Sequence, residues 1–265
     1  MLVVGAAAGS VGALFGIGGG VFLVPILNVA FGIPLRNAAA ISLTTVVATS
    51  SSVAAGRIGT QLINLRLAMV LEVATVAGGL TGGLTAHLFS ESSLQRTFGI
   101  VALAAAAGVG SRVNRRNVIL DSTIDVGRLG GRFHEDESGG EIAYRVIRLP
   151  LALVASFVAG TISSLLGVGG GVVKVPALNA WCGVPLRAAA ATSAFMIGVT
   201  ATSGAIIYFG RGDLAPLMAA PVVLGVQLGS RAGLRLAERL PARWLKLSLS
   251  IVLVAVAATM FVRSF

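Results

Sequence analysis

Few residues of this chain could act on a ligand, and two of them are charges within long apolar stretches. Lys174 lies three residues after Gly171 in "GVGGGVVKVPALN", and Glu72 lies five residues into the apolar stretch that begins at Leu67. A charge within a bilayer is costly unless it is paired or faces water, so such residues are functional candidates. We interpret Lys174 as a group that attracts an anion, with a static ion pair as the alternative. Glu72 is a candidate for proton coupling or for pairing with Lys174, with a snorkelling end residue as the alternative.

Two similar glycine runs must position these charges. The segment "GIGGGVFLVPILNVAFGIPLR" at 16–36 recurs as "GVGGGVVKVPALNAWCGVPLR" at 167–187, and 16 of the 25 positions from 16 to 40 are identical at an offset of 151 residues. Irregular backbone is tolerated at membrane depth only where protein buries it or where it lines an aqueous cavity. A helix that begins after the third glycine points free N–H groups and its positive dipole end into that cavity.

The sequence therefore predicts an anion site near the membrane midplane, built from both glycine runs. Close helix packing is the alternative explanation for these glycines. The expected backbone ligands are Gly18, Gly19, Gly20, Gly169, Gly170 and Gly171. Helix packing is the favoured explanation for the glycines that are spaced by four, which are Gly78, Gly82, Gly225, Gly229 and Gly233.

Polar side chains near the glycine runs could complete such a site, because small oxyanions are held by several hydroxyl and amide donors. Hydroxyl groups in membrane helices also bond to the preceding turn, and the asparagines could instead pin the end of each short helix. Arg36 and Arg187 either anchor the two hairpin mouths or gather anions there. The candidate ligands are Asn28, Ser42, Thr44, Thr45, Asn179, Thr192 and Ser193.

Composition places these elements in a membrane. The 265 residues are 55% hydrophobic and only 11% charged, with a mean hydropathy of +0.92, which is far too apolar for a soluble domain. A helix needs about 20 residues to cross the hydrocarbon. We therefore expect an all-α, multi-pass protein of the cytoplasmic (inner) membrane. The apolar stretches lie at 2–31, 37–55, 67–88, 98–110, 149–182, 188–209, 214–236 and 245–262.

Three segments are expected along the chain: an N-terminal transmembrane repeat at 1–110, a polar cytoplasmic loop at 111–148 and a C-terminal transmembrane repeat at 149–265. We interpret the loop as solvated, with a short amphipathic piece near 118–126. The single cysteine excludes an internal disulfide, and neither a metal nor a cofactor is expected. The basic residues that give the net charge of +10 lie beside the apolar stretches. The expected partner is therefore the lipid bilayer and not nucleic acid. The sequence leaves open whether the protein forms a homo-oligomer.

The distribution of Lys and Arg favours two inverted-topology repeats. If each glycine break turns the chain back as a re-entrant hairpin, the flanking Lys and Arg divide 15 to 4 between the two sides, with Lys174 left out. If each break is crossed as one span, they divide 11 to 8. Basic residues prefer the cytoplasmic side, so each half is expected to hold a glycine-broken hairpin plus about three transmembrane helices, with both termini outside. The four outer residues are Arg36, Arg96, Arg211 and Arg263.

The paired motif resembles a known family. "GIGGGxxxVPxL" followed by "GIPLRxAAAxS", repeated as "GVGGGxxxVPxL" and "GVPLRxAAAxS", is similar to the TauE/SafE family of sulfite and organosulfur anion exporters. The resemblance covers nearly the whole chain apart from the charged central loop, where it departs from the family. It implies transport of small sulfur-containing anions such as sulfite, thiosulfate or sulfoacetate, coupled to an ion gradient.

The sequence thus favours a secondary transporter that moves such anions by alternating access, with protons as the candidate coupling ion. Internal repeats in a membrane protein are typical of transporters. The alternatives are an anion channel and a non-transporting membrane scaffold subunit. An enzyme is not expected, because the chain has no H-E-x-x-H, G-x-S-x-G or paired-aspartate constellation.

Overall fold

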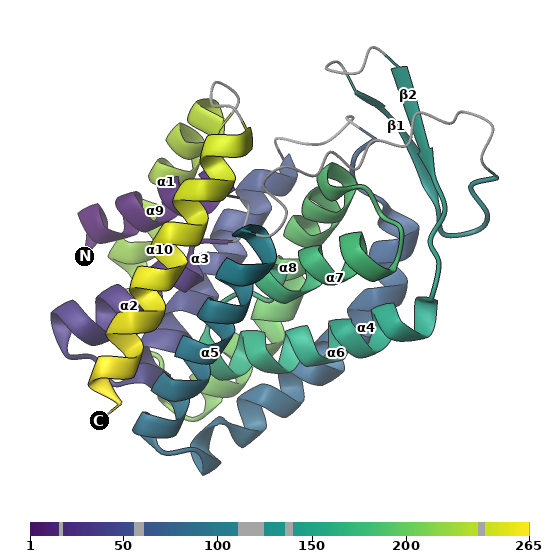
Figure 1. The fold of residues 1–265 in the computed structure, drawn as a ribbon. Helices are drawn as coiled ribbons and strands as arrows, with labels where there is room; N and C mark the ends of the chain where they lie inside the picture. The colour runs from purple at the N-terminus through teal and green to yellow at the C-terminus, as the bar shows by residue number, and fades with distance from the viewer. Residues whose placement is uncertain (16–17, 56–60, 111–124, 136–139, 238–241, 265) are drawn as a thin grey trace.

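The computed structural model describes residues 1–15, 18–55, 61–110, 125–135, 140–237 and 242–264 (Figure 1). The first half forms helices α1 (Leu2–Phe15), α2 (Gly20–Phe31), α3 (Leu35–Ala55), α4 (Leu65–Thr85) and α5 (Glu91–Gly110), with a short 3₁₀ helix η1 (Ala86–Leu88) after α4. The second half forms α6 (Leu149–Leu166), α7 (Gly171–Trp181), α8 (Leu186–Gly210), α9 (Pro216–Ala237) and α10 (Ala242–Arg263). Two strands, β1 (Gly131–Glu135) and β2 (Gly140–Tyr144), lie between the halves. The predominance of helices agrees with the prediction of an all-α membrane protein.

The helices of the second half repeat those of the first in order, and their contacts follow the repeat. Helix α1 packs against α9, and its counterpart α6 packs in the same way against α4. Helices α3 and α8, which are counterparts of each other, cross at the centre, and α5 lies along α10. The two halves of the chain are therefore interleaved, because each supplies a helix that the other packs against (Figure 1).

Glycines spaced by four bring these paired helices into backbone contact. A Cβ at Gly78 or Gly82 of α4 would overlap the carbonyl oxygens of Phe157 and Thr161 in α6. The glycines of α9 meet α1 in the same way, with Gly225, Gly229 and Gly233 against the carbonyls of Leu2, Ala6 and Ser10. Small residues on one helix face allow this close approach in membrane proteins. The prediction that these glycines serve helix packing is confirmed.

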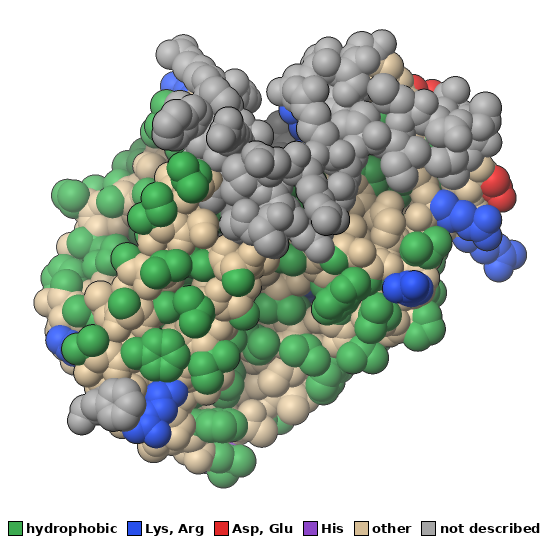
Figure 2. Space-filling view, viewed as in Figure 1, with side chains coloured by type: hydrophobic (Ala, Val, Ile, Leu, Met, Phe, Trp, Pro, Cys, Tyr) green, Lys and Arg blue, Asp and Glu red, His purple; other side chains and the backbone are tan. Residues whose placement is uncertain are grey.

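The outer surface of the helices is apolar. Among the described residues, three helices are long and apolar enough to cross a membrane: Leu65–Leu88, Leu149–Leu166 and Leu186–Gly210. Large hydrophobic side chains such as Val73, Leu217 and Val262 are exposed on them and on their neighbours. Figure 2 shows hydrophobic side chains spread over the helical face, with basic side chains near its margins. Such a surface suits lipid and not water, so the structure is that of a membrane protein.

One end of the bundle gathers the four arginines that were expected on the outer side, and each donates to a backbone carbonyl. Arg211 donates to Gly83 and Leu84 in the last turn of α4, and Arg263 donates to Asn28 and Val29 in the last turn of α2. The remaining contacts are Arg36 to Phe89 and Arg96 to Ser264. These bonds satisfy carbonyls that a helix end leaves unpaired. They match the anchoring interpretation of Arg36.

The segment between the halves differs from the solvated loop that its polar composition predicts. Strands β1 and β2 pair antiparallel, with Phe133 opposite Ile142. Side chains alternate along a strand, so Phe133, Ile142 and Tyr144 share one face, and this face is buried against α4, α6, α7 and α8. Burial raises the pKa of Tyr144, and a hydrogen bond from the Asn64 amide opposes this shift. The predicted amphipathic piece lies outside the described residues, apart from 125–126.

Candidate functional site

Both glycine runs break the helix at the predicted place. The φ angles are +86° at Gly18 and +75° at Gly19, and +86° at Gly169 and +65° at Gly170. Residues with a Cβ rarely adopt this left-handed backbone, so the matching pairs of glycines let each chain segment turn. Helix α2 then begins at Gly20, and α7 begins one repeat later.

After the second break, helix α7 brings the chain back to the residues that precede helix α6. The Ile147 N–H, just before α6, donates to the carbonyl of Cys182, just after α7, at 3.1 Å. Helix α6 has 18 residues, against 14 in α1, so this first arm is longer than its counterpart. The turn after each short helix is held by its asparagine. The Asn28 amide donates to Ile33 O at 2.9 Å, and the Asn179 amide donates to Val184 O at 3.0 Å, which matches the pinning alternative.

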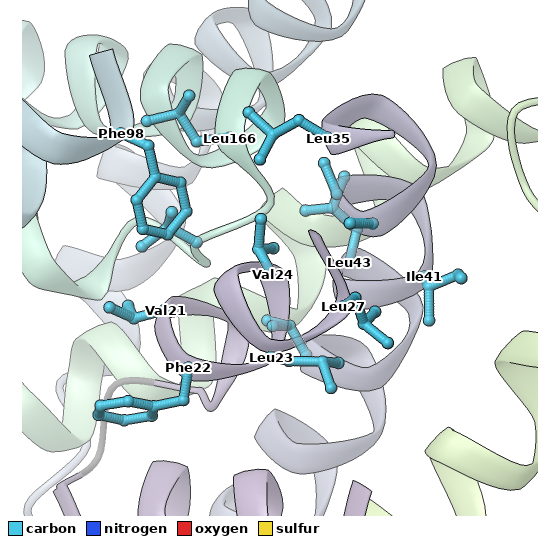
Figure 3. Close-up of a cluster of buried hydrophobic side chains, with 14 of the residues drawn as sticks. Val21, Phe22, Leu23, Val24, Leu27, Leu35, Ile41, Leu43, Phe98 and Leu166 are labelled. Carbon is cyan, nitrogen blue, oxygen red and sulfur yellow. The ribbon is translucent and has the colours of Figure 1, made fainter. Parts of the chain in front are cut away.

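The two breaks meet where α3 and α8 cross. The Ser42 hydroxyl of α3 donates to Gly167 O, at the end of α6, at 2.6 Å. A Cβ at Gly18 would lie 3.4 Å from Val46 of α3 and 3.5 Å from Ile197 of α8, which are counterparts in the repeat. Figure 3 shows how α2 runs through the buried cluster, with Val24 facing Leu43 of α3. The predicted convergence of the two glycine runs at the centre of the bundle is therefore present.

Two buried hydroxyl groups flank the start of α7. Ser193 Oγ lies 3.5 Å from the position of a Cβ at Gly171, and Ser163 Oγ lies 3.6 Å from that of a Cβ at Gly170. Both serines are fully buried, and within the described residues neither hydroxyl has a hydrogen-bond partner. A buried hydroxyl without a partner carries a desolvation cost. The site thus offers two free donors at the positive end of a helix.

The two charges predicted within the membrane also meet. Lys174 Nζ lies 4.0 Å from Glu72 Oε2 and donates to Thr200 Oγ1 at 3.3 Å, while Thr200 donates to Glu72 Oε1 at 2.8 Å. The Lys174 side chain is fully buried, whereas that of Glu72 is 14% exposed. Lys174 lies in the first turn of α7, so this polar cluster begins directly beside the glycine break. At the repeat counterpart of Lys174 the chain has Leu23, which is also buried.

Three other predicted ligands lie elsewhere or use their hydroxyls within their own helix. Thr44 donates to Ile41 O and Thr45 donates to Ser42 O, which matches the alternative of bonding to the preceding turn. Thr192 accepts a hydrogen bond from the Asn64 N–H, and the Asn64 side chain donates to Tyr144 of the strand pair.

Sequence reasoning missed two residues of the site, Ser163 and Thr200. A signal for Thr200 exists, since it lies seven residues after Ser193 and thus on the same face of a helix. For Ser163 the signal is that the other copy has a glycine, Gly12, at the equivalent position.

Comparison with known proteins agrees with this architecture. The sequence profile described as "Sulfite exporter TauE/SafE" matches residues 1–260. The probable membrane transporter protein YunE of Bacillus subtilis (strain 168) is 24% identical over 263 residues, which cover 97% of this chain and 94% of the relative. The probable membrane transporter protein MJ0441 of Methanocaldococcus jannaschii is 25% identical over 272 residues, covering 96% of this chain and 91% of the relative. No solved structure matches the chain significantly. With the profile spanning nearly its whole length, the chain belongs to the sulfite exporter TauE/SafE family of membrane transporters.

Proposed function

We propose that this protein is a secondary transporter that moves small sulfur-containing anions across the cytoplasmic membrane by alternating access. Sulfite, thiosulfate, sulfoacetate and similar organic anions form the substrate class, and protons are the coupling ion. The observation that carries the proposal is the buried ammonium of Lys174 in the first turn of α7, directly after the break at Gly169 and Gly170. A fixed positive charge beside a helix N-terminus is a site for an anion.

The surroundings of this charge favour a small oxyanion. The Ser163 and Ser193 hydroxyls can donate to oxygen acceptors without giving up a present partner. Low dielectric strengthens each charge-assisted hydrogen bond, so a few donors suffice to hold a compact anion. The choice of sulfur-containing anions follows from the name of the family. These anions are small and carry several oxygen atoms on one sulfur atom.

The orientation of the two short helices supports inverted repeats. The end of α2 is bonded to Arg263 and, through Asn28, to Glu91 at the start of α5. The end of α7 lies at the opposite end of the bundle, where Cys182 bonds to Ile147 and the strand pair packs. Two short helices that run in opposite directions from a shared centre give each side of the membrane an equivalent route to the site. Exchange between the two arrangements is the usual basis of alternating access in such folds.

Glu72 is the proposed coupling residue. Its carboxylate is partly exposed and lies beside Lys174, so the pair is neutral when both groups are charged. An anion that binds to Lys174 leaves one negative charge uncompensated, and a proton on Glu72 restores neutrality. Low dielectric makes an uncompensated charge costly, so the two binding events support each other.

Flux into sealed proteoliposomes tests the proposal. The purified protein is reconstituted, and uptake of labelled sulfite, thiosulfate and sulfoacetate is followed with and without a proton gradient, against empty liposomes. A secondary transporter gives saturable uptake that a proton gradient drives above equilibrium. Fast uptake that no gradient changes supports an anion channel, and equal flux in protein-containing and empty liposomes supports a scaffold subunit.

A further inference from the structure

The two glycine breaks are alike in backbone but differ in chemistry. We propose that the anion binds at only one of them, the N-terminus of α7, between Ser163, Ser193 and Lys174, and that the α2 break is its structural counterpart. This inference rests on the proposed transport of anions and narrows it to one site in each chain. The sequence alone predicts a site built from both runs, with Lys174 as an anion-attracting charge beside the second one.

At the α7 end, three groups can serve an anion at once. The Ser163 and Ser193 hydroxyls come from α6 and α8, so they approach adjacent residues of the break from two different helices. Neither hydroxyl has a partner within the described part of the chain, although both are fully buried. Lys174 adds a positive charge one turn along the same helix. A buried donor without a partner calls for an explanation, and a bound ligand that satisfies it is one.

At the α2 end, the equivalent groups are absent or already engaged. Gly12 stands where the second copy has Ser163, and a Cβ there would overlap the backbone of Gly19, so the backbone of the α2 break itself occupies the space of a side chain. Ser42, the counterpart of Ser193, donates its hydroxyl to the carbonyl of Gly167. Leu23 stands in place of Lys174 and is completely buried. An anion at this end would meet no free hydroxyl and no ammonium among these equivalent positions.

The same contacts explain what the α2 end does instead. The bond from Ser42 to Gly167 joins the first half of the chain to the turn that precedes α7. Gly20 approaches the same carbonyl, and its Cβ position lies 2.7 Å from Ser42 Oγ. The α2 break therefore supports the backbone of the α7 break from across the centre of the bundle. A small oxyanion with two or three acceptor oxygens, such as sulfite, thiosulfate or a sulfonate group, matches the two hydroxyls and the ammonium at the α7 end.

Calorimetric titration of the full chain in lipid nanodiscs tests the single site. Sulfite, thiosulfate and sulfoacetate are each titrated, and the variants are measured with the anion that the unaltered protein binds most tightly. We expect one anion per chain. Ser163→Ala and Ser193→Ala should each weaken binding by about tenfold, and Lys174→Met by roughly ten- to a hundredfold.

The repeat supplies a matched control. Leu23→Met alters the position of the α2 end that is equivalent to Lys174 and should keep the dissociation constant within about twofold. Melting temperatures of all variants are measured in the same nanodiscs. If Lys174→Met does not fold, the double variant Glu72→Gln and Lys174→Met removes both charges and takes its place.

The outcomes separate this inference from the transport proposal. Two anions per chain, or equal weakening by Leu23→Met and Lys174→Met, overturns the single site while saturable flux in proteoliposomes leaves the transporter in place. If the unaltered protein binds none of the three anions and moves none of them, the proposed function fails and the site fails with it.

Discussion

Lys174 and Glu72 are linked through one hydroxyl group, that of Thr200, which accepts a hydrogen bond from the ammonium and donates one to the carboxylate. The three side chains come from α7, α4 and α8, so the contact ties the glycine-broken segment to two long helices. Removing one member of such a buried pair leaves the other charge uncompensated.

Charge pairing gives the first prediction. Lys174→Met should lower the free energy of unfolding by about 1.5 to 3 kcal/mol, because the Glu72 carboxylate loses its charged partner. Adding Glu72→Gln should restore most of that stability, since the glutamine needs no counter-charge, but it should not restore anion affinity. Thermal melting and calorimetry on the two single variants and the double variant form a cycle that separates these effects. A double variant with ordinary anion affinity would show that Lys174 is only a structural partner.

Backbone at the glycine break gives the second prediction. Gly170→Val should abolish flux, because valine is strained at a φ of +65° by about 1 to 2 kcal/mol and its side chain would crowd Ala159 O and Ser163. Gly212→Ala is the matched control, since Gly212 also has a positive φ but lies in open space. It should insert and transport normally despite similar strain. Normal flux through Gly170→Val, at equal amounts of protein in the membrane, would reduce the glycine break to a packing element.

Topology is the third prediction. In a cysteine-free background made by Cys182→Ala, His134→Cys in the strand pair should resist an impermeant maleimide in intact cells, while His87→Cys should react. Both side chains are exposed. His87 follows the end of α4 that bonds to Arg211, whereas His134 lies in β1, which packs against the first turns of α4. Permeabilised cells serve as the control, because both cysteines should then react. Labelling of His134→Cys from outside would reverse the proposed orientation.

The fourth prediction concerns the strand pair. Phe133→Ala should cost about 3 to 5 kcal/mol of local stability, because Phe133 is 1% exposed and packs edge-on against Tyr144, with ring centroids 6.4 Å apart. The segment should then be cleaved faster by protease in detergent or nanodiscs. Arg132→Ala, which alters the neighbouring exposed side chain of β1, should leave the cleavage rate unchanged. Equal cleavage of both variants would argue against docking of the strands on the helices.

The glycine breaks could be predicted from sequence because they follow from local chemistry. Glycine runs and prolines inside an apolar stretch interrupt a helix, and the same pattern occurs in both repeats. Pairing of Lys174 with Glu72 could also be considered from the sequence, as the alternative to an anion-attracting Lys174, because few charged residues lie in the apolar stretches. The bridge through Thr200 depends on the register of α8 against α4 and α7, which only tertiary packing sets.

Two features escaped sequence reasoning for different physical reasons. The strand pair was hidden because charged residues alternate with its buried face, so overall composition indicated a solvated loop. The difference between the two serines was hidden because Ser42 and Ser193 both follow an AAA-x pattern at the same place in the repeat. What separates them is the contact from Ser42 to Gly167, which joins opposite halves of the chain and has no local signature.

The arginines over the ends of α2 and α4 have a consequence for the rate at which an anion arrives from that side. Arg211 and Arg263 are held against helix carbonyls, so the negative dipole ends offset part of their charge. Long-range electrostatic steering, which accelerates association and fades as ionic strength rises, is therefore weaker at this face than unpaired arginines would make it. The association rate of an anion from that side should fall only modestly with added salt.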